Sequence, residues 1–316
     1  MAYVRSKLLH LVPVLLLVTL GTFLLTTLMP GDPAQTIAGS SATAEQVEFV
    51  REDLGLDQPF LVRYVSWLTD VVRGDLGRSY RTGQPVLDAI VQRLPVSISL
   101  MALSQVIAFL IAVPLGIIGA YRARGWFDRA STSFSYGMIS VPHFVLAIAL
   151  VWLVALQLGW LPATGYAALT DGPVTWLRHL LLPALALAGS QVAIYHRLLR
   201  GDMLTTLQQD YVLLAKAKGL PTWFILLRHA LRPSSFSLVT MAGINIGRLI
   251  GGAVIIEIIF ALPGIGQLLI QSLYNRDFLM LQGVVLFTAV AYIVINTAVD
   301  LLYARLDPRV SHARAA

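Results

Sequence analysis

Six long apolar stretches with few charges determine what this chain can fold into. A helix needs about 20 apolar residues to cross the hydrocarbon core of a bilayer. The sequence has 316 residues and contains six stretches of suitable length. We therefore predict an all-α polytopic membrane protein with six transmembrane helices. The stretches are approximately residues 8–29, 95–121, 132–158, 179–198, 234–260 and 280–303.

The overall composition agrees with this prediction. The chain is 57% hydrophobic and only 13% charged, and its mean hydropathy is +0.73. A soluble domain carries about a quarter charged residues, whereas charges inside a bilayer are costly. The chain has no cysteine, which excludes disulfides, thiolate chemistry and cysteine metal sites.

The distribution of basic residues predicts an orientation. With both termini on the same side, that side carries 14 basic and four acidic residues, and the other side carries eight basic and eleven acidic residues. Positive residues favour the cytoplasmic side of a membrane. We therefore expect both termini in the cytoplasm and the chain in the inner or plasma membrane.

This orientation divides the chain into four parts. We expect a tail and first span over 1–29, a small extracytoplasmic helical domain over 30–93, a transmembrane core over 94–304 and a cytoplasmic tail over 305–316.

The expected extracytoplasmic domain contains two helix signals. Thr43 with Gln46 favours the start of a helix that ends near Gly55. Asp57 and Pro59 favour the start of a second helix, which runs to about Gly74. This second helix has a modest apolar face that needs a neighbour. The face consists of Leu61, Val65, Leu68 and Val72.

The polar segment 201–233 separates two apolar stretches and predicts two short helices joined by a turn. Thr206 with Gln209 suggests a capping box for the first helix. Gly219 can adopt the left-handed conformation at its end, and Pro221 suits the first turn of the next helix. A helix this short is not stable alone and must dock on a partner. Helical spacing places Tyr211, Leu214, Ala215 and Lys218 on one face.

Sequence patterns in several parts of the chain resemble the permeases of ABC importers, specifically the dipeptide and oligopeptide class. In the polar segment the patterns are Asp210-Tyr211-Val212, residues 215–220 (AKAKGL), His229 and Leu231-Arg232. The acidic residue that opens the wider family's Glu-Ala-Ala pattern is absent here. Further patterns are residues 55–59 (GLDQP), 74–77 (GDLG), 142–144 (PHF) and 263–266 (PGIG).

The resemblance implies a type I ABC importer fold and a role as a transport subunit rather than an enzyme. It implies a pathway for di- or oligopeptides that is completed by a second homologous permease. It also implies two cytoplasmic ATPase subunits, which bind ATP and Mg, and an extracytoplasmic substrate-binding protein. The chain itself is expected to sit in membrane lipid and to bind no cofactor, metal or nucleic acid. The loop residues that would couple it to the ATPases are Asp210, Tyr211, Leu214, Ala215, Lys216, Ala217, Lys218, Gly219, Arg228, His229 and Arg232.

The fifth apolar stretch combines small and polar residues. Gly243, Gly247 and Gly251 form a small-xxx-small ridge that allows another helix to approach closely. Asn245, Arg248 and Glu257 are polar groups within the same stretch. Arg248 and Glu257 lie nine residues apart and so on opposite faces. Because charge inside a membrane usually marks a pathway, we predict that Arg248 lines one, and we place Asn245 and Glu257 with it. The alternative is that each polar residue pairs with a neighbouring helix or reaches the membrane interface, and for Glu257, nearer the outer end, both interpretations stay open.

Other functions remain open on sequence grounds. A similar permease for nickel or another small solute fits the same patterns. A secondary transporter is less favoured, because the six stretches show no inverted repeat. An intramembrane serine protease built on Ser190 and His196 lacks a nucleophile elbow. The sequence contains no phosphate-binding Gly-x-x-x-x-Gly-Lys-Ser/Thr motif.

Overall fold

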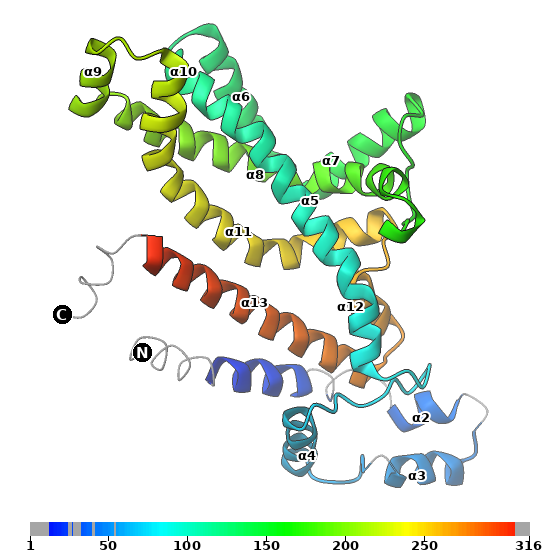
Figure 1. Cartoon of the computed structure of the whole chain (residues 1–316). Coiled ribbons are helices and arrows are strands. Elements are labelled where there is room, and N and C mark those ends of the chain that lie inside the picture. The colour runs from blue at the N-terminus through cyan, green and yellow to red at the C-terminus, as the bar shows by residue number, and fades with distance from the viewer. Residues whose placement is uncertain (1–12, 25–26, 28–32, 40–41, 54, 307–316) are drawn as a thin grey trace, which may run out of the picture. The chain divides into compact units, whose positions relative to one another are not determined.

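The computed structural model describes residues 13–24, 27, 33–39, 42–53 and 55–306 (Figure 1). These residues are helical almost throughout, and their extended pairing is limited to an isolated bridge between Arg78 and Pro85. The all-α prediction is confirmed. The chain forms two compact units, residues 1–95 with 264–293 and residues 96–263 with 294–316.

The first unit contains a helix over Pro13–Leu24 and several short helices. These are α2 (Pro33–Ala38), α3 (Ala44–Asp53), α4 (Phe60–Val72) and α12 (Ile265–Tyr274).

Most of the long helices belong to the second unit, and α5 and α13 cross the division between the units. The elements are α5 (Val86–Tyr121), α6 (Trp126–Ser140), α7 (His143–Leu150), the π-helical η1 (Val151–Gln157), the 3₁₀ turn η2 (Leu169–Asp171), α8 (Pro173–Thr206), α9 (Asp210–Ala217), α10 (Thr222–Phe224), the π-helical η3 (Ile225–Ala230), α11 (Leu231–Ile259) and α13 (Phe278–Leu306).

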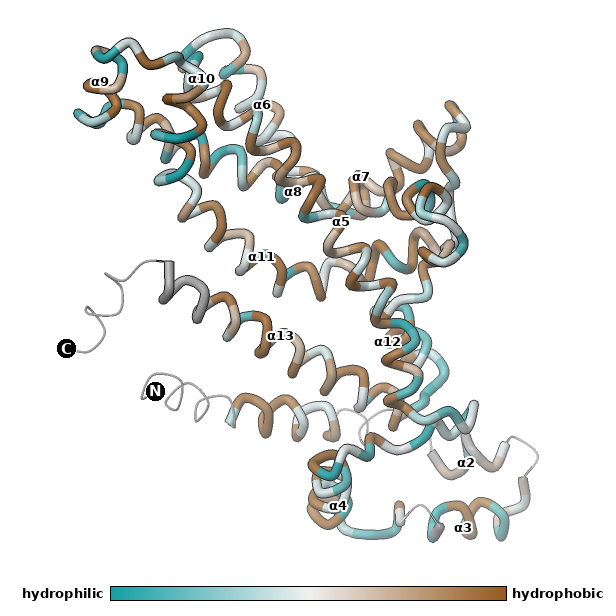
Figure 2. Tube along the Cα trace, viewed as in Figure 1, coloured by the Kyte–Doolittle hydropathy of each residue, from teal (hydrophilic) through white to brown (hydrophobic). Residues whose placement is uncertain are grey.

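Four of the six predicted spans appear as single helices that are long and apolar enough to cross a membrane. Hydrophobic residues dominate these helices (Figure 2). The first predicted span, 8–29, is described over Pro13–Leu24, an apolar helix of shorter length, and its ends lie outside the described residues. The four long helices are Val86–Tyr121, Pro173–Thr206, Thr222–Ile259 and Phe278–Val299.

The third predicted span, 132–158, is broken, so the expectation of one continuous helix there is wrong. Helices α6 and His143–Gln157 meet at an angle of 105°. Pro142 has no backbone N–H, and the ring of a proline disfavours helical backbone at the residue before it. Val141 accordingly adopts an extended conformation, with φ −92° and ψ 119°.

Helix α8 forms the centre of the second unit. It packs against α6, α7 and α11, and its buried side chains extend from Leu180 to Met203. Small residues permit close approach: a Cβ on Gly189 would lie 2.5 Å from Leu146 Cδ2, and one on Gly116 would lie 3.1 Å from Leu199 Cδ2. Protein interiors are close-packed, so such positions tolerate little added volume.

Within the first unit, α3 and α4 form where the sequence predicts them. The amide of Thr43 donates to Gln46 Oε1 at 2.9 Å, and the amide of Gln46 donates to Thr43 Oγ1 at 3.3 Å. This reciprocal pair is a capping box. Helix α4 begins after Pro59, which is its N-cap rather than its first helical residue. No side chain makes a capping hydrogen bond at the start of α4.

The buried face of α4 differs from the predicted one. Its buried side chains are Tyr64 and Trp67, whereas Leu61, Val65 and Val72 are exposed. Aromatic residues bury more area than aliphatic ones, and here they cluster around Phe23, with ring centroids 5.6 and 5.9 Å away.

The loop after α4 is fastened to the start of α13. Ser79 Oγ donates a short hydrogen bond to the buried Asp277 carboxylate. Arg81 Nη1 donates to the carbonyl oxygen of Asn275 at 3.3 Å. Gly77 has φ +80°, which favours glycine. Its amide donates to Asp75 Oδ1 at 2.8 Å. The 74–77 pattern noted in the sequence is therefore a tight turn that positions Ser79.

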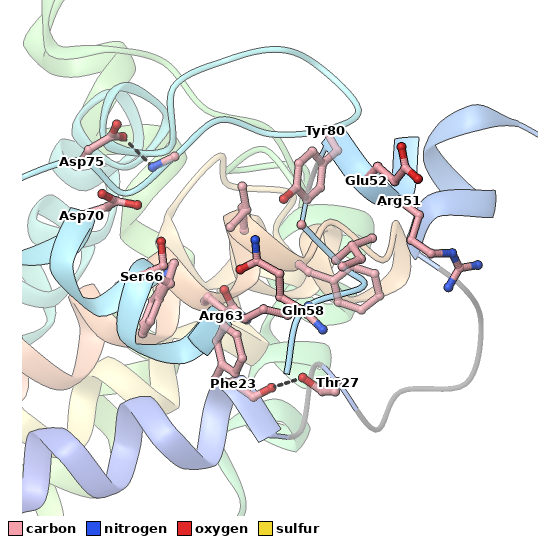
Figure 3. A pocket seen from close by; sticks show the side chains of 17 residues that line it. Phe23, Thr27, Arg51, Glu52, Gln58, Arg63, Ser66, Asp70, Asp75 and Tyr80 are labelled. Carbon is pink, nitrogen blue, oxygen red and sulfur yellow. Dashed lines mark hydrogen bonds between the residues drawn. The ribbon is translucent and has the colours of Figure 1, made fainter. Parts of the chain in front are cut away.

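A cavity of about 600 Å³ lies between this loop and α4 (Figure 3). Its wall includes Arg63, Asp70 and Tyr80. Burial raises the pKa of Tyr80, with Arg63 lowering it and Asp277 raising it by smaller effects. The phenol therefore stays neutral at physiological pH.

Candidate functional site

Helix α9 ends in a Schellman motif. Gly219 has φ +74°, the left-handed conformation predicted for it. Its amide donates to the carbonyl of Lys216 at 2.9 Å, and the amide of Leu220 donates to the carbonyl of Ala215 at 3.3 Å. These two bonds define the motif and satisfy carbonyls at the helix end. The chain then turns to Pro221, the N-cap of α10.

The predicted capping box at the start of α9 does not form. Gln209 is the N-cap and makes no side-chain capping bond. Thr206 is instead the last residue of α8, and its hydroxyl accepts a hydrogen bond from Ser234 Oγ at 2.9 Å. The hydroxyl of Thr206 therefore bonds to a residue 28 positions later in the sequence. Local sequence does not reveal this partner.

Ala215 faces the interior of the chain, so the prediction that it shares an outward face with Tyr211 and Leu214 is wrong. Ala215 and Val212 are buried against Ile225, with Leu207 alongside. Helix α9 thus has an apolar neighbour of its own. Its small cluster holds α9 against η3 and leaves the opposite side of the helix free.

The free side of α9 and the start of the following helix carry exposed apolar side chains, which we call the α9 patch. Leu214 is 57% exposed and Trp223 is 64% exposed. Leu213 and Trp223 were missed at the sequence level, although a tryptophan in a polar loop, here two residues after Pro221, is a signal for a contact surface. The α9 patch comprises Tyr211, Leu213, Leu214, Leu220, Trp223 and Leu227.

Basic residues surround the α9 patch. Lys216, Lys218, Arg228 and Arg232 are exposed, and in the described part of the chain none of them forms an ion pair. The Arg228 guanidinium lies 5.9 Å from the centre of the Phe224 ring. The α9 patch thus has an apolar centre and positive charges at its edge. Such a surface is complementary to one that is apolar in the centre and acidic around it.

The other predicted residues of the loop have defined places. Asp210 begins α9 and is exposed, and Ala217 and Lys218 are exposed at its end. His229 is half-buried, its ring 5.5 Å from that of Phe224, and its carbonyl accepts a hydrogen bond from Tyr211 Oη at 3.4 Å. The tyrosine therefore ties α9 to η3.

A cavity of about 550 Å³ lies beside α9. It is bounded by the end of α5, the end of α8 and the start of the helix after α9. Lys216 and Leu220 lie at its edge together with Tyr121.

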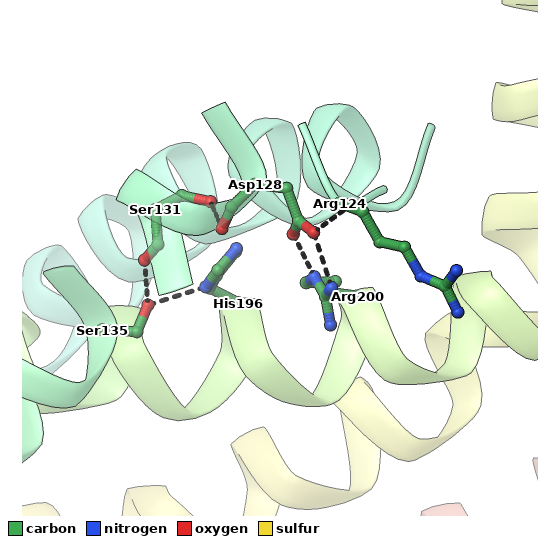
Figure 4. A network of polar contacts seen from close by, with 6 residues as sticks. All are labelled: Arg124, Asp128, Ser131, Ser135, His196 and Arg200. Carbon is green, nitrogen blue, oxygen red and sulfur yellow. Dashed lines mark hydrogen bonds and ion pairs between the residues drawn. The ribbon is translucent and has the colours of Figure 1, made fainter. Parts of the chain in front are cut away.

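A polar network fixes α6 to α8 (Figure 4). The buried Asp128 carboxylate accepts two hydrogen bonds from Arg200, from Nε and from Nη2, the second at 2.7 Å. It also accepts the backbone N–H of Arg124 at 2.8 Å. Arg124 has φ +66°, so this bond supports an unfavourable backbone conformation.

His196 extends the same network. Its Nδ1 lies 2.7 Å from Ser135 Oγ, and Ser135 donates to the Ser131 carbonyl at 2.9 Å. Gly119 of α5 makes room for the network, since a Cβ there would lie 3.5 Å from both Asp128 Oδ1 and His196 Nε2. No single segment of sequence indicates this arrangement.

Helix α11 carries the polar residues that the sequence places on a pathway. Arg248 is exposed, whereas Glu257 is fully buried and accepts a hydrogen bond from Ser97 Oγ at 2.6 Å. The two residues lie on opposite sides of the helix, as predicted. Burial and pairing with Ser97 favour a packing role of Glu257, so its predicted place on a pathway is not supported.

Asn245 is also buried, and it lies at the Tyr195 hydroxyl. That hydroxyl donates to Gln105 Oε1 at 3.1 Å, and Gln105 Nε2 donates to the Ala242 carbonyl at 3.3 Å. Buried polar groups in proteins are normally hydrogen-bonded. Gln105 and Tyr195 thus join α5, α8 and α11, whereas Asn245 Nδ2 is buried without a hydrogen-bond partner among the described residues. The place of Asn245 on a pathway therefore stays a prediction.

The three glycines of α11 have different surroundings. A Cβ on Gly243 would lie 2.3 Å from Val299 Cγ1, so α13 approaches closely there. Gly247 is buried, but Gly251 is exposed with open space around it. The predicted ridge therefore packs within the chain at Gly243 and is open at Gly251.

The structure is similar to a solved ABC importer. A chain of the MetNI methionine ABC transporter in an inward-facing conformation aligns with a TM-score of 0.58 over 70% of this chain and 97% of that chain, at 16% sequence identity. At this identity the likeness establishes the fold. The fold is that of a type I ABC importer permease.

Family comparison then identifies the chain. Residues 112–312 match the model of the binding-protein-dependent transport system inner membrane component, and residues 1–101 match the N-terminal model of the same systems. The chain belongs to this family and is a permease subunit of an ABC importer.

Curated relatives match over nearly the full length. A putative peptide transport system permease of Brucella abortus is 43% identical over 98% of this chain and 99% of its own. The dipeptide transport system permease protein DppB of Alkalihalophilus pseudofirmus is 36% identical over 99% and 100%. The glutathione transport system permease protein GsiC of Escherichia coli is 37% identical over 98% and 99%.

Proposed function

We propose that this chain forms half of the translocation pathway of an ATP-driven importer for short peptides. A second homologous permease completes the pathway, and an extracytoplasmic binding protein delivers the peptide. Two cytoplasmic ATPase subunits bind ATP and Mg and supply the energy. The chain forms part of the pathway and passes the movement of the ATPase subunits to its membrane helices. Both of its termini lie in the cytoplasm.

The α9 patch is the observation that supports this proposal most strongly. A short helix is held by its own apolar cluster of Val212, Ala215 and Ile225, yet it leaves Leu213 and Leu214 more than half exposed. Apolar helix faces of this kind fit into grooves of partner proteins. Because α9 is fixed to η3, which leads into α11, a displacement of α9 is passed to a membrane helix.

The names of the relatives support a peptide as the substrate. These include peptide, dipeptide and glutathione permeases, and glutathione is itself a small peptide. A permease for nickel or another small solute is the alternative. Mass spectrometry of the ligand that co-purifies with the cognate binding protein separates the two, since a bound metal without peptide contradicts our assignment.

The coupling proposal is tested with Leu214→Asp in the complete complex reconstituted in liposomes. A charge in the centre of an apolar contact removes an anchor residue and introduces an unpaired carboxylate. Such central residues contribute about 2 kcal/mol or more to binding, so we expect at least a tenfold weaker association with the ATPase subunits. Substrate-stimulated ATP hydrolysis and uptake should fall together, while the two permeases still co-purify.

Leu169→Asp is the matched control. Leu169 is a 61% exposed leucine in η2, far from α9 in the sequence, and its substitution should leave ATPase association unchanged. Full coupling and normal ATPase association in Leu214→Asp would show that the α9 patch is not the transmission surface.

A further inference from the structure

Helix α4 has an apolar stripe that is not covered by its own unit. Leu61, Val65 and Val72 are 67%, 58% and 82% exposed. With half-buried Leu68 they recur at intervals of four, three and four residues, which places them along one side of the helix. We call these four residues the free stripe of α4. Exposing so much apolar surface to water is unfavourable, so the free stripe needs an apolar environment.

A second side of α4 packs on a membrane helix. Phe60, Tyr64 and Trp67 all contact the Phe23 ring, with centroids 5.3, 5.6 and 5.9 Å away. One residue of helix Pro13–Leu24 thus meets two turns of α4. Figure 1 shows α4 nearly end-on, whereas helix Pro13–Leu24 runs across the view.

The contacts of Tyr64 show how deep α4 lies. Its hydroxyl is 2.8 Å from Thr19 Oγ1 and 3.5 Å from the carbonyl oxygen of Leu16. Thr19 lies near the middle of the predicted apolar stretch 8–29 and five residues before Leu24, where the described helix ends. A side chain of α4 therefore reaches the hydrocarbon region. Leu286, eight residues into the span Phe278–Val299, belongs to the same cluster.

The third side of α4 is polar. Arg63, Ser66 and Asp70 line the cavity of about 600 Å³ described above (Figure 3), and Arg73 is exposed. Around the helix, the side that packs on the membrane helix is followed by the free stripe and then by the polar side. Amphipathic helices that lie in a membrane surface show this arrangement, with the apolar side buried about 5–10 Å below the headgroup boundary.

We infer that α4 lies in the membrane–water interface, with the free stripe inserted among lipid acyl chains. Helix Pro13–Leu24, on which α4 packs, exposes apolar side chains as well: Leu17, Leu20 and Leu24 are exposed. This inference goes beyond the proposed function. It depends on the membrane embedding of the first unit and not on the substrate or on ATP coupling.

Site-directed spin labelling tests the inference directly, because the chain has no native cysteine. Val65→Cys and Val72→Cys would carry nitroxides in the complete complex, with the cysteines of its other subunits replaced, in lipid nanodiscs. The collision rates with oxygen, which concentrates in lipid, and with a water-soluble nickel chelate are then compared. We expect labels on the free stripe to be at least threefold more accessible to oxygen than to the chelate.

Ser66→Cys and Arg73→Cys provide matched controls on the polar side of the same helix, where the chelate should be the stronger collider. Two results would overturn the inference. High chelate accessibility at positions 65 and 72 would place the free stripe in water. Low accessibility to both reagents would mean that another protein covers it. Co-purification of all subunits establishes that each labelled complex is assembled, and Leu61→Cys replaces any position that fails this requirement.

Discussion

Asp128 joins segments of the second unit that lie far apart in the sequence, and no local sequence pattern predicts this. It binds Arg200 of α8 and the backbone of Arg124, and its side chain is 5% exposed. Removing one partner of a buried ion pair leaves an uncompensated charge, which costs about 3–5 kcal/mol. The 25% exposure of the Arg200 side chain favours the lower end of that range.

Arg200→Gln should therefore destabilise the complex by about 3 kcal/mol and lower its thermal unfolding temperature. Fluorescence-monitored unfolding of the purified complex measures this change. Arg197→Gln is the control, since Arg197 lies on the same helix and is exposed. Equal unfolding temperatures for the two variants would contradict a stabilising role of the network.

At the same scale, neighbouring residues of α9 and α11 have opposite environments. Leu214 is exposed and Ala215 is 5% exposed, although both seemed to belong to one face. On α11, Arg248 remains the candidate pathway residue. It shares its exposed side with Ile244 and Ile255, which are apolar, so its charge lacks an evident packing reason.

Arg248→Ala should reduce uptake by about tenfold while complex assembly and ATP binding stay intact, because an intramembrane charge on a solute pathway acts on transport rather than on folding. Radiolabelled uptake into liposomes gives the measurement, and Ile244→Ala, one turn away on the same side, serves as the comparison. Loss of assembly in Arg248→Ala would instead identify the arginine as a structural partner.

At the scale of elements, local signals determined where helices begin and end more reliably than which side they bury. The capping box of Thr43 and Gln46 forms as predicted, because both residues are in the same turn. Thr206 does not cap α9, because α8 continues through Thr206 and α9 begins only at Asp210, with Gln209 as its N-cap. The break at Pro142 has a local cause in the proline ring, yet hydropathy alone does not distinguish it from a continuous span.

At the scale of the whole molecule, the distribution of charge predicts a topology that a labelling experiment can test. Basic residues number 14 on one side and eight on the other, and the side richer in Lys and Arg remains in the cytoplasm. Single cysteines at Asp57 and Gln208, both exposed, should react with a membrane-impermeant maleimide from opposite sides of sealed cells. Asp57→Cys should be labelled in intact cells and Gln208→Cys only after permeabilisation. Labelling of both in intact cells contradicts the topology.

The sequence by itself determined the membrane class, the approximate positions of the four long apolar helices and the turn at Gly219. These depend on hydropathy and backbone preferences within short segments, so nearby residues suffice to predict them. The family resemblance could also be read from the sequence, because it rests on contiguous patterns.

Only the tertiary structure decided which side chains are buried. Ser97 pairs with Glu257 and Asp128 with Arg200, across separations of 160 and 72 residues. Ala215 is covered by Ile225, and Tyr64 rather than Leu61 or Val65 packs on helix Pro13–Leu24. In each case burial depends on the surface that a distant segment presents, and periodicity within one helix contains no information about that segment.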